Sequence, residues 1–278
     1  MIKRQDLTES RVITQMEYEG YLDTLNLDFS NLIDSPDQIG TATNDYMRVL
    51  GCAVDLKLKK DKIIDLLTLV KEFGKANFMS IVKSKNTKEI TFQNKKHPFK
   101  YSNKINYADP SSWCNSFFTS IILRDKETAK FFSSIPAEIH FSGNVSMNNL
   151  YHIEVEIIKN FYNSGKFNDA LFSASFNEID KSSLDNYDYN NITKCLKPFL
   201  TLLKNVSDND EEAFNQNLEK ALIAHQKFWT AKTNDRFYDS KGWVSLPILA
   251  VASLGKDKGF KIQIESEYTP MWLIDKIF

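Results

Sequence analysis

Glycine and proline are scarce in this sequence, with 9 and 7 residues among 278. Proteins built from many short strands need these residues at their tight turns, and nucleotide sites use glycine-rich loops to approach phosphates. Neither G-x-G-x-x-G nor G-x-x-x-x-G-K-[ST] occurs in the chain. The scarcity therefore argues against an all-β protein and against a bound nucleotide cofactor, and it favours helices.

Cysteine is also rare. The three residues, Cys52, Cys114 and Cys195, are odd in number, widely spaced and set among apolar residues. A disulfide framework needs pairs, so we expect buried, reduced thiols in a reducing compartment. The polar N-terminus has no apolar run behind it, which is not typical of a secretory signal. These features predict a cytoplasmic protein.

Long apolar runs and an excess of one charge are missing as well. The longest apolar stretches, Ile63–Val70 and Ser245–Leu254, are far shorter than the about 20 residues that a membrane-spanning helix needs. The 35 lysines and arginines nearly balance the 36 aspartates and glutamates, for a net charge of −1. No long-range field would draw the chain to nucleic acid or to an anionic membrane, so neither is expected as a partner.

Apolar side chains are plentiful, because 42% of the residues are hydrophobic and these include 20 Phe and 11 Tyr. This is enough material for a large core. Over most of the chain the apolar residues recur at spacings of three and four, which places them along one face of a helix. Helices are predicted over residues 11–32, 43–56, 63–81, 110–122, 126–133, 146–161, 167–176, 192–206, 210–232 and 246–256.

A few segments depart from the helical pattern. Residues 88–101 alternate apolar and polar side chains around a turn at Asn94, which predicts a β-hairpin. Residues 261–264 are strand-like, and the polar residues 177–191 are predicted to be a loop. Two amphipathic helices joined at Gly165 resemble a tetratricopeptide unit. The predicted fold is mainly α, an irregular array of antiparallel helical pairs, tetratricopeptide-like in part, with one small β-hairpin near 88–101.

No glycine- or serine-rich linker marks a domain boundary. Residues 1–278 are therefore predicted to form a single helical domain. An alternative is an N-terminal helical layer, 1–105, packed on a C-terminal helical array, 106–278. The first 40 residues receive no role from the sequence.

Residues capable of chemistry form no recognisable motif. The four histidines do not occur as H-E-x-x-H, and no cysteine pair has the spacing of a zinc site. His152 and Glu156 lie four residues apart without a third ligand nearby, and Cys114 lacks a positioned base in the sequence. We therefore predict no metal, no cofactor and no catalytic residue. The enzymatic alternative is a dispersed site on His152, Glu156 or Cys114.

Three segments of the C-terminal third resemble a known family through their order and spacing. They are Gly242–Ala250 (GWVSLPILA), Lys256–Phe260 (KDKGF) and Glu265–Pro270 (ESEYTP). Together they resemble the immunity protein 49 family of bacterial polymorphic-toxin systems. The likeness extends in outline over residues 40–275 and is strongest in the last 60.

The resemblance implies a cytoplasmic antidote that binds the C-terminal domain of a cognate toxin and blocks it. Such a role needs a complementary surface and no catalytic group. The family-like residues Pro247, Gly259, Tyr268 and Pro270 suit helix ends and packing, so no binding residue is carried over from the family. The alternative is a tetratricopeptide-like helical scaffold that binds peptides or partner proteins.

Two acidic segments are candidates for the partner-binding surface if the toxin is basic, because opposite charge speeds association. Solvated loops are the competing explanation, and in the second segment Ser207 or Asp208 is expected to cap the helix that follows. The candidate residues are Glu178, Asp180, Asp185, Asp188, Asp208, Asp210, Glu211 and Glu212.

Overall fold

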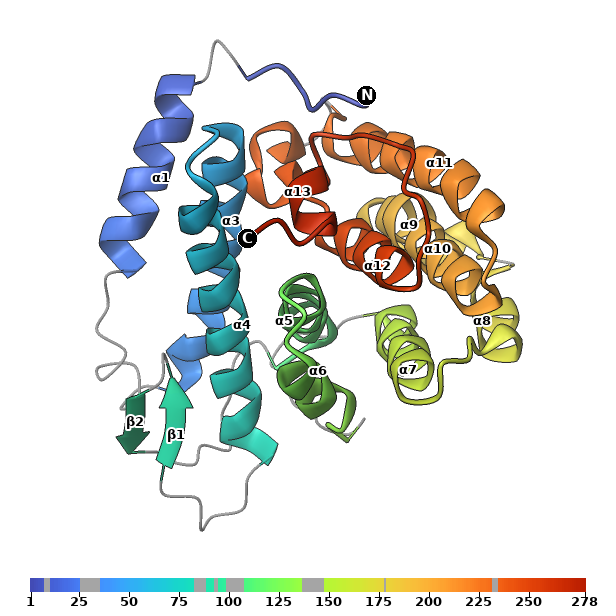
Figure 1. Cartoon of the computed structure of the whole chain (residues 1–278), viewed down its shortest axis with the longest axis horizontal. Coiled ribbons are helices and arrows are strands. Elements are labelled where there is room, and N and C mark those ends of the chain that lie inside the picture. Colours follow the sequence, from blue (N-terminus) through green and yellow to red (C-terminus); the bar gives the residue numbers. More distant parts are fainter. Residues whose placement is uncertain are drawn as a thin grey trace. The chain divides into compact units, whose positions relative to one another are not determined.

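The protein is mainly α-helical, as predicted (Figure 1). The computed structural model describes residues 1–7, 11–25, 36–82, 89–92, 95–98, 108–136, 148–177, 179–231 and 235–278. Its contacts divide the chain into two compact units. The C-terminal unit comprises Met1–Asp6 and Asn148–Phe278, and the N-terminal unit comprises Leu7–Met147. The alternative division into an N-terminal layer, 1–105, and a C-terminal array, 106–278, remains a prediction.

The N-terminal unit consists of helices and one hairpin. Helix α4 packs against both α3 and α5, and α1 packs against α3. The helix α3 begins at Pro36, earlier than the predicted start at Thr43 or Asn44, because proline suits the first turn of a helix. The elements are α1 (Arg11–Leu25), α3 (Pro36–Asp55), α4 (Lys60–Val82), β1 (Glu89–Phe92), β2 (Lys95–Pro98), α5 (Pro110–Ile122) and α6 (Lys126–Ser133).

The predicted β-hairpin is confirmed. Strands β1 and β2 pair antiparallel, with Ile90 opposite His97 and Phe92 opposite Lys95. Phe92 is buried, and its ring lies 4.7 Å from that of Phe73 on α4 in an edge-on contact. One aromatic contact thus helps to hold the hairpin on α4. The outer part of the predicted hairpin, residues 99–101, lies outside the described residues.

Helices α4 and α5 approach each other closely at Gly74. A Cβ atom at this position would lie 1.7 Å from Oγ of Ser116, so no side chain larger than hydrogen fits. The same face of α5 buries Trp113, whose ring stacks on Phe117 and whose Nε1 donates to the carbonyl of Phe132 at 3.0 Å. The close approach places α5 deep in the core of this unit.

Replacing Gly74 by alanine should lower the free energy of unfolding by about 1–3 kcal/mol, because the added methyl group overpacks the contact. Urea unfolding measures this change. The matched control is Gly20→Ala on α1, where a Cβ meets nothing within 4 Å; there the higher helix propensity of alanine should stabilise the protein by up to about 1 kcal/mol. The double variant Gly74→Ala/Ser116→Gly should recover part of the loss. Equal stability of the two alanine variants would contradict the close approach.

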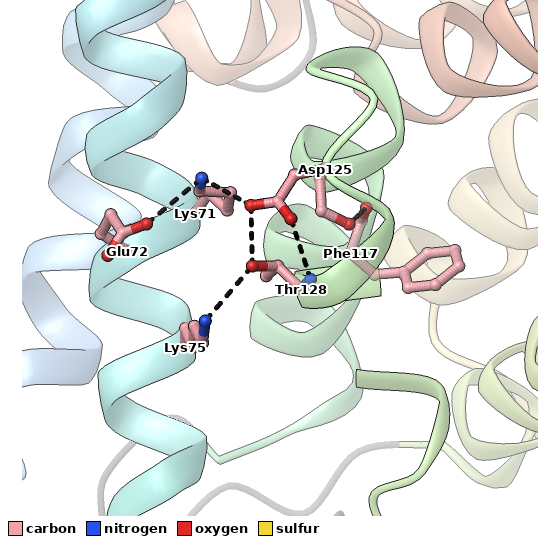
Figure 2. Close-up of polar contacts among 7 residues, drawn as sticks. Lys71, Glu72, Lys75, Phe117, Asp125 and Thr128 are labelled. Atoms are coloured by element: carbon pink, nitrogen blue, oxygen red, sulfur yellow. Dashed lines mark hydrogen bonds and ion pairs between the residues drawn. The ribbon is translucent and has the colours of Figure 1, made fainter. Parts of the chain in front are cut away.

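A polar junction joins α4 to the start of α6 (Figure 2). Asp125 caps α6 by accepting the N–H of Thr128 at 3.0 Å. Its other oxygen accepts from Nζ of Lys71 and from the hydroxyl of Thr128, both at 2.8 Å. Lys71 also pairs with Glu72 at 3.2 Å, and Nζ of Lys75 donates to the Thr128 hydroxyl at 3.4 Å. The carboxylate of Asp125 therefore caps its own helix and also accepts a hydrogen bond from the neighbouring one.

Burial alone would raise the pKa of Asp125, but the hydrogen bonds from Lys71 and Thr128 outweigh it and hold the pKa at about 2. A carboxyl group whose pKa falls on folding stabilises the fold above its unfolded pKa, near 4, and loses this contribution as the pH drops towards 2. The junction is thus a source of acid sensitivity.

Replacing Asp125 by asparagine should lower stability at pH 7 by about 1–3 kcal/mol, because asparagine can still cap the helix but cannot pair with Lys71. The difference between variant and wild type should shrink between about pH 4 and pH 2. Urea unfolding at several pH values measures it. Glu127→Gln, at an exposed position of the same helix turn, is the control. A pH-independent difference would show that the ion pair does not act as described.

The C-terminal unit begins with the predicted helical pair, which is confirmed. Helix α7 ends at Gly165, whose φ of 71° is the left-handed conformation that favours glycine at this position. The elements are α7 (Asn149–Ser164), α8 (Asp169–Phe176), η3 (Lys181–Ser183), α9 (Asn186–Asn191), η4 (Ile192–Leu196), α10 (Lys197–Asp208), α11 (Glu211–Trp229), η5 (Asp235–Tyr238), η6 (Ser240–Trp243), α12 (Leu246–Asp257) and α13 (Met271–Ile274).

Elements α9, η4 and α10 form one uninterrupted helical segment over residues 186–208. The middle element, η4, is a π-helical turn, in which the N–H of Lys197 reaches the carbonyl of Ile192. Proline at position 198 has no N–H and its ring crowds the preceding turn, so a wider turn relieves the conflict.

The prediction of a loop up to residue 191 was wrong for residues 186–191, because Asp185 caps a helix there.

The strand predicted over residues 261–264 was also wrong. No strand forms there; the side-chain amide of Asn215 on α11 takes the place of a neighbouring strand. Its Nδ2 donates to the carbonyl of Lys261 at 3.0 Å, and its Oδ1 accepts the N–H of Gln263 at 2.9 Å. The apolar alternation suggested a strand here. A side chain instead provides the hydrogen bonds that the extended backbone would otherwise form with a neighbouring strand.

The first six residues belong to the C-terminal unit, although the residues that follow them in sequence belong to the N-terminal unit. Ile2 forms a short parallel bridge with Ser266, in which its N–H donates to Glu265 and its carbonyl accepts from Glu267. The side chain of Gln5 accepts the hydroxyl of Tyr268 at 3.0 Å. These contacts give the N-terminal segment the structural role that the sequence did not reveal. Among the described helices, none has the length and apolar character needed to cross a membrane.

Candidate functional site

The sequence-predicted acidic residues fall into two groups at opposite ends of the helical segment 186–208. Asp185 and Asp188 lie at its start, and Asp208 is its last residue. A helix rises about 1.5 Å per residue, so residues 186–208 span roughly 34 Å. The two groups therefore cannot form one continuous acidic patch. Glu178 lies outside the described residues.

The first group has local structural roles. Asp180 caps the 3₁₀ turn η3, and hydrogen bonds from the hydroxyl and N–H of Ser182 lower its pKa. Asp185 caps α9 by accepting the N–H of Asp188 at 2.7 Å. Asp188 in turn accepts the hydroxyl of Tyr151, on α7, at 2.8 Å.

The second group surrounds the turn between α10 and α11. Asp210 caps α11 by accepting the N–H of Ala213 at 2.9 Å. The prediction that Ser207 or Asp208 forms this cap was therefore wrong. The hydroxyl of Ser207 instead accepts the N–H of Phe167 at 2.9 Å. Asp208 pairs with Lys204 at 3.0 Å. Glu211 and Glu212 occupy the first turn of α11, where the helix dipole favours negative charge.

An exposed aromatic surface lies beside the first acidic group. Tyr187 on α9 and Tyr238 on η5 are exposed, and Arg236 on η5, whose Nε and Nη1 are buried, lies against Tyr187; we call these three residues the tyrosine surface. The guanidinium of Arg236 lies 4.1 Å from the centroid of the buried Phe228 ring and 5.8 Å from that of Tyr187. The Tyr187 and Phe228 rings are 5.8 Å apart. Tyr187 and Tyr238 nevertheless remain 48% and 59% exposed.

Sequence reasoning missed the tyrosine surface. Its parts come from positions almost fifty residues apart, and neither contains a motif. The one local signal was the pair of tyrosines in the acidic segment around Asp188, which the polar composition led us to interpret as a loop. Only the helix that forms there places Tyr187 against Arg236 and Phe228.

Buried titratable groups lie close to this surface. Glu154 on α7 is only 8% exposed. Burial therefore raises its pKa to about 8. Burial also raises the pKa of the Cys195 thiol to about 12, in spite of the opposing charges of Arg236 and Lys194. Both groups are thus protonated in the folded protein at neutral pH.

Replacing Glu154 by glutamine should stabilise the protein above about pH 5. The folded protein keeps the Glu154 proton up to about pH 8, whereas the unfolded chain releases it near its ordinary value of 4.5. Wild-type stability is therefore lost as the pH rises from 4.5 to 8, and the advantage of the variant should grow over the same interval.

Urea unfolding at pH 5, 6.5 and 8 tests this expectation. Glu156→Gln, on the exposed side of the same helix, is the matched control and should change stability little at any of these pH values. An advantage of Glu154→Gln that stays constant with pH would mean that the carboxyl group is already ionised in the folded protein.

The residues of the enzymatic alternative belong to two different units of the chain. Cys114 is buried on α5 in the N-terminal unit, whereas His152 and Glu156 belong to α7 in the C-terminal unit. Glu156 is exposed. Within the described parts of the chain, no group of three histidine, cysteine, aspartate or glutamate side chains could hold a metal ion.

His225 is a core residue. Its Nε2 lies 2.9 Å from the carbonyl of Gly242, and its ring packs edge-on against Tyr268 at 4.8 Å. Burial lowers its pKa to about 4, against a smaller opposing effect of the hydrogen bond. A Cβ on Gly242 would lie only 2.1 Å from the ring of Trp229, so a glycine is required there.

The segments that carried the family resemblance surround this core. Pro247 lies in the first turn of α12, and Gly259, with φ of 100°, follows the end of that helix. Tyr268 is fully buried and bonded to the N-terminal segment. These residues maintain the fold, as their chemistry suggested.

The model of the family described as immunity protein 49 matches residues 56–273. The chain belongs to the immunity protein 49 family. The match covers most of both units, so it concerns the whole fold and not a single motif. No curated protein and no solved structure is similar enough to the chain to match it.

Proposed function

We propose that this protein is a bacterial immunity protein that binds a cognate toxin domain in the cytoplasm and neutralises it by covering its active site. The observation that carries the proposal is membership of the immunity protein 49 family over residues 56–273. Covering an active site needs only a complementary surface, of about 800 Å² on each partner. No bond need be made or broken by the antidote.

The chemistry of the buried groups supports a binding role. A nucleophilic cysteine must be a thiolate near neutral pH, but burial raises the pKa of Cys195 to about 12. A general acid or base works best with a pKa near the working pH, but burial lowers that of His225 to about 4. Both side chains are placed as packing groups.

A rigid helical array also suits tight inhibition. Helix ends in the C-terminal unit are fixed by side-chain caps at Asn148, Asn168, Asp185 and Asp210. A surface that is ordered before binding loses little conformational entropy in the complex. The candidate contact residues remain the acidic side chains predicted from the sequence, now divided between two ends of one helical segment.

Co-expression tests the proposal. The gene next to this one should encode a toxin whose C-terminal domain stops growth of a bacterial host when expressed alone. Co-expression of this chain should restore growth, and the two proteins should purify as a 1:1 complex. A growth-arrested host in spite of abundant soluble antidote would refute neutralisation.

The helical pair joined at Gly165 favours one other candidate function, a tetratricopeptide-like scaffold for peptides or partner proteins. This function predicts micromolar binding of extended peptides and no protection against the neighbouring toxin. The co-expression experiment therefore separates the two functions.

A further inference from the structure

We propose that the N-terminal segment, Met1–Asp6, is exchanged between two copies of this chain, so that the segment of each copy completes the C-terminal unit of the other. The inference is independent of the proposed function. It begins from the division of the chain, because the segment belongs to the C-terminal unit whereas Leu7, which follows it directly, belongs to the N-terminal unit. An element that docks on a unit distant from it in sequence can dock equally on the same unit of a second copy.

The backbone of the segment is held as an extended peptide is held at a strand-addition site. The N–H of Ile2 donates to the carbonyl of Glu265 at 2.9 Å, and the carbonyl of Ile2 accepts the N–H of Glu267 at 3.0 Å. The carbonyl of Lys3 accepts from Nε2 of Gln226, on α11, at 2.8 Å. Main-chain hydrogen bonds of this kind provide the affinity in peptide recognition by strand addition.

One side chain of the segment makes the contact specific. The amide of Gln5 donates to the carbonyl of Phe237, on η5, at 2.9 Å and accepts the hydroxyl of Tyr268 at 3.0 Å. Gln5 is the one buried side chain of the segment, whereas Met1 is 74% exposed. Hydrogen bonds more than apolar burial therefore hold the segment, which suits a contact that can be released and made again.

The site that the segment occupies is unfavourable when it is empty. Tyr268 is fully buried, and without Gln5 its hydroxyl would lose an acceptor. A polar group left unpaired in a protein interior costs more free energy than a formed hydrogen bond gains. The occupant that the structure shows is the chain's own segment, so the segment of a second copy restores the same contacts.

The connection between the segment and the next helix also favours exchange. The segment ends at Asp6 and α1 begins at Arg11, so only residues 7–10 join them. Short connections favour the exchange of an element between copies. Reciprocal exchange closes a symmetric dimer in which each segment is bound and each site is filled. A closed dimer is therefore the expected product.

Cross-linking between two single-cysteine variants tests the exchange. Ile2 and Ser266 are partners in the parallel bridge, and adjacent strands lie about 5 Å apart, a distance that a disulfide can span. The Ile2→Cys and Ser266→Cys chains are mixed at high concentration, incubated and oxidised, and the disulfide-linked peptides are identified by mass spectrometry. A disulfide between positions 2 and 266 can form in this mixture only between two molecules.

Ser182→Cys, on η3, is the matched control for Ser266→Cys, because Ser182 is exposed whereas Ser266 is buried. Random collisions would link Ile2→Cys more readily to the exposed position. Exchange should instead favour position 266 at least about tenfold, because the bound segment holds the two thiols together. The wild-type chain, with its three native cysteines, gives the background. A yield at position 266 no greater than that of the control would overturn the proposal.

Competition between the two segments gives a second test, because Gln5→Ala weakens only the segment that carries it. In the Ile2→Cys chain it weakens the incoming segment, and the cross-link should fall at least about fivefold. In the Ser266→Cys chain it weakens the resident segment, and the cross-link should rise. Arg4→Ala, which removes the guanidinium hydrogen bond to the carbonyl of Glu267, gives the same comparison if Gln5→Ala perturbs the fold. Equal effects in the two chains would contradict exchange.

The oligomeric state provides the third measurement. Size-exclusion chromatography with light scattering should show a wild-type dimer whose fraction grows with concentration. Ile2→Cys/Ser266→Cys, oxidised in dilute solution, fixes each segment on its own chain and should stay monomeric over the same range. A wild-type chain that remains monomeric throughout would refute the exchange. The proposed function would then still stand, because none of these measurements involves the toxin.

Discussion

The missing N–H of proline 198 constrains the helical segment 186–208 of the C-terminal unit. A proline inside a helix loses one hydrogen bond and crowds the preceding turn, at a cost of about 3 kcal/mol or more in a regular helix. The chain avoids this cost by widening into the π turn η4, which inserts one residue and rotates the preceding turns by about 100° relative to α10. Ile192 and Leu196, the first and last residues of the turn, are buried, and so are Phe199 and Leu203 in α10.

Two features lie at or next to the π turn. Neither tyrosine of α9 is buried, and Tyr187 lies against Arg236 and Phe228. Within the turn, Cys195 is partly buried, and this burial raises the pKa of its thiol to about 12.

At several places, polar side chains form hydrogen bonds with backbone or side-chain groups that the packed helices would otherwise leave without partners. Asn215 bonds both neighbours of Ile262, and Gln5 and Tyr268 connect the two ends of the C-terminal unit. In the N-terminal unit, a hydrogen bond from Lys71 to Asp125 links two helices. Each such bond is worth only about 1 kcal/mol, but leaving its buried partner unpaired would cost more.

Much of the fold was determined by the sequence itself, because helix periodicity, caps and hairpin alternation are patterns within a few residues of one another. The helical pair joined at Gly165 and the β-hairpin near 88–101 were readable in this way, and so was the family likeness. The predicted loop over 186–191 failed because a polar stretch can continue an apolar helix once Asp185 caps it.

The tertiary structure alone decided which distant residues meet. No local pattern could show that Arg4 bonds Glu267, or that Arg236 stacks on Tyr187. Nor could composition show that the seven acidic candidates among the described residues fall into two groups, since the helical segment of roughly 34 Å between the groups appears only in the folded chain. Spacing along the chain specifies the faces of each element, whereas a binding surface depends on how those faces are brought together in space.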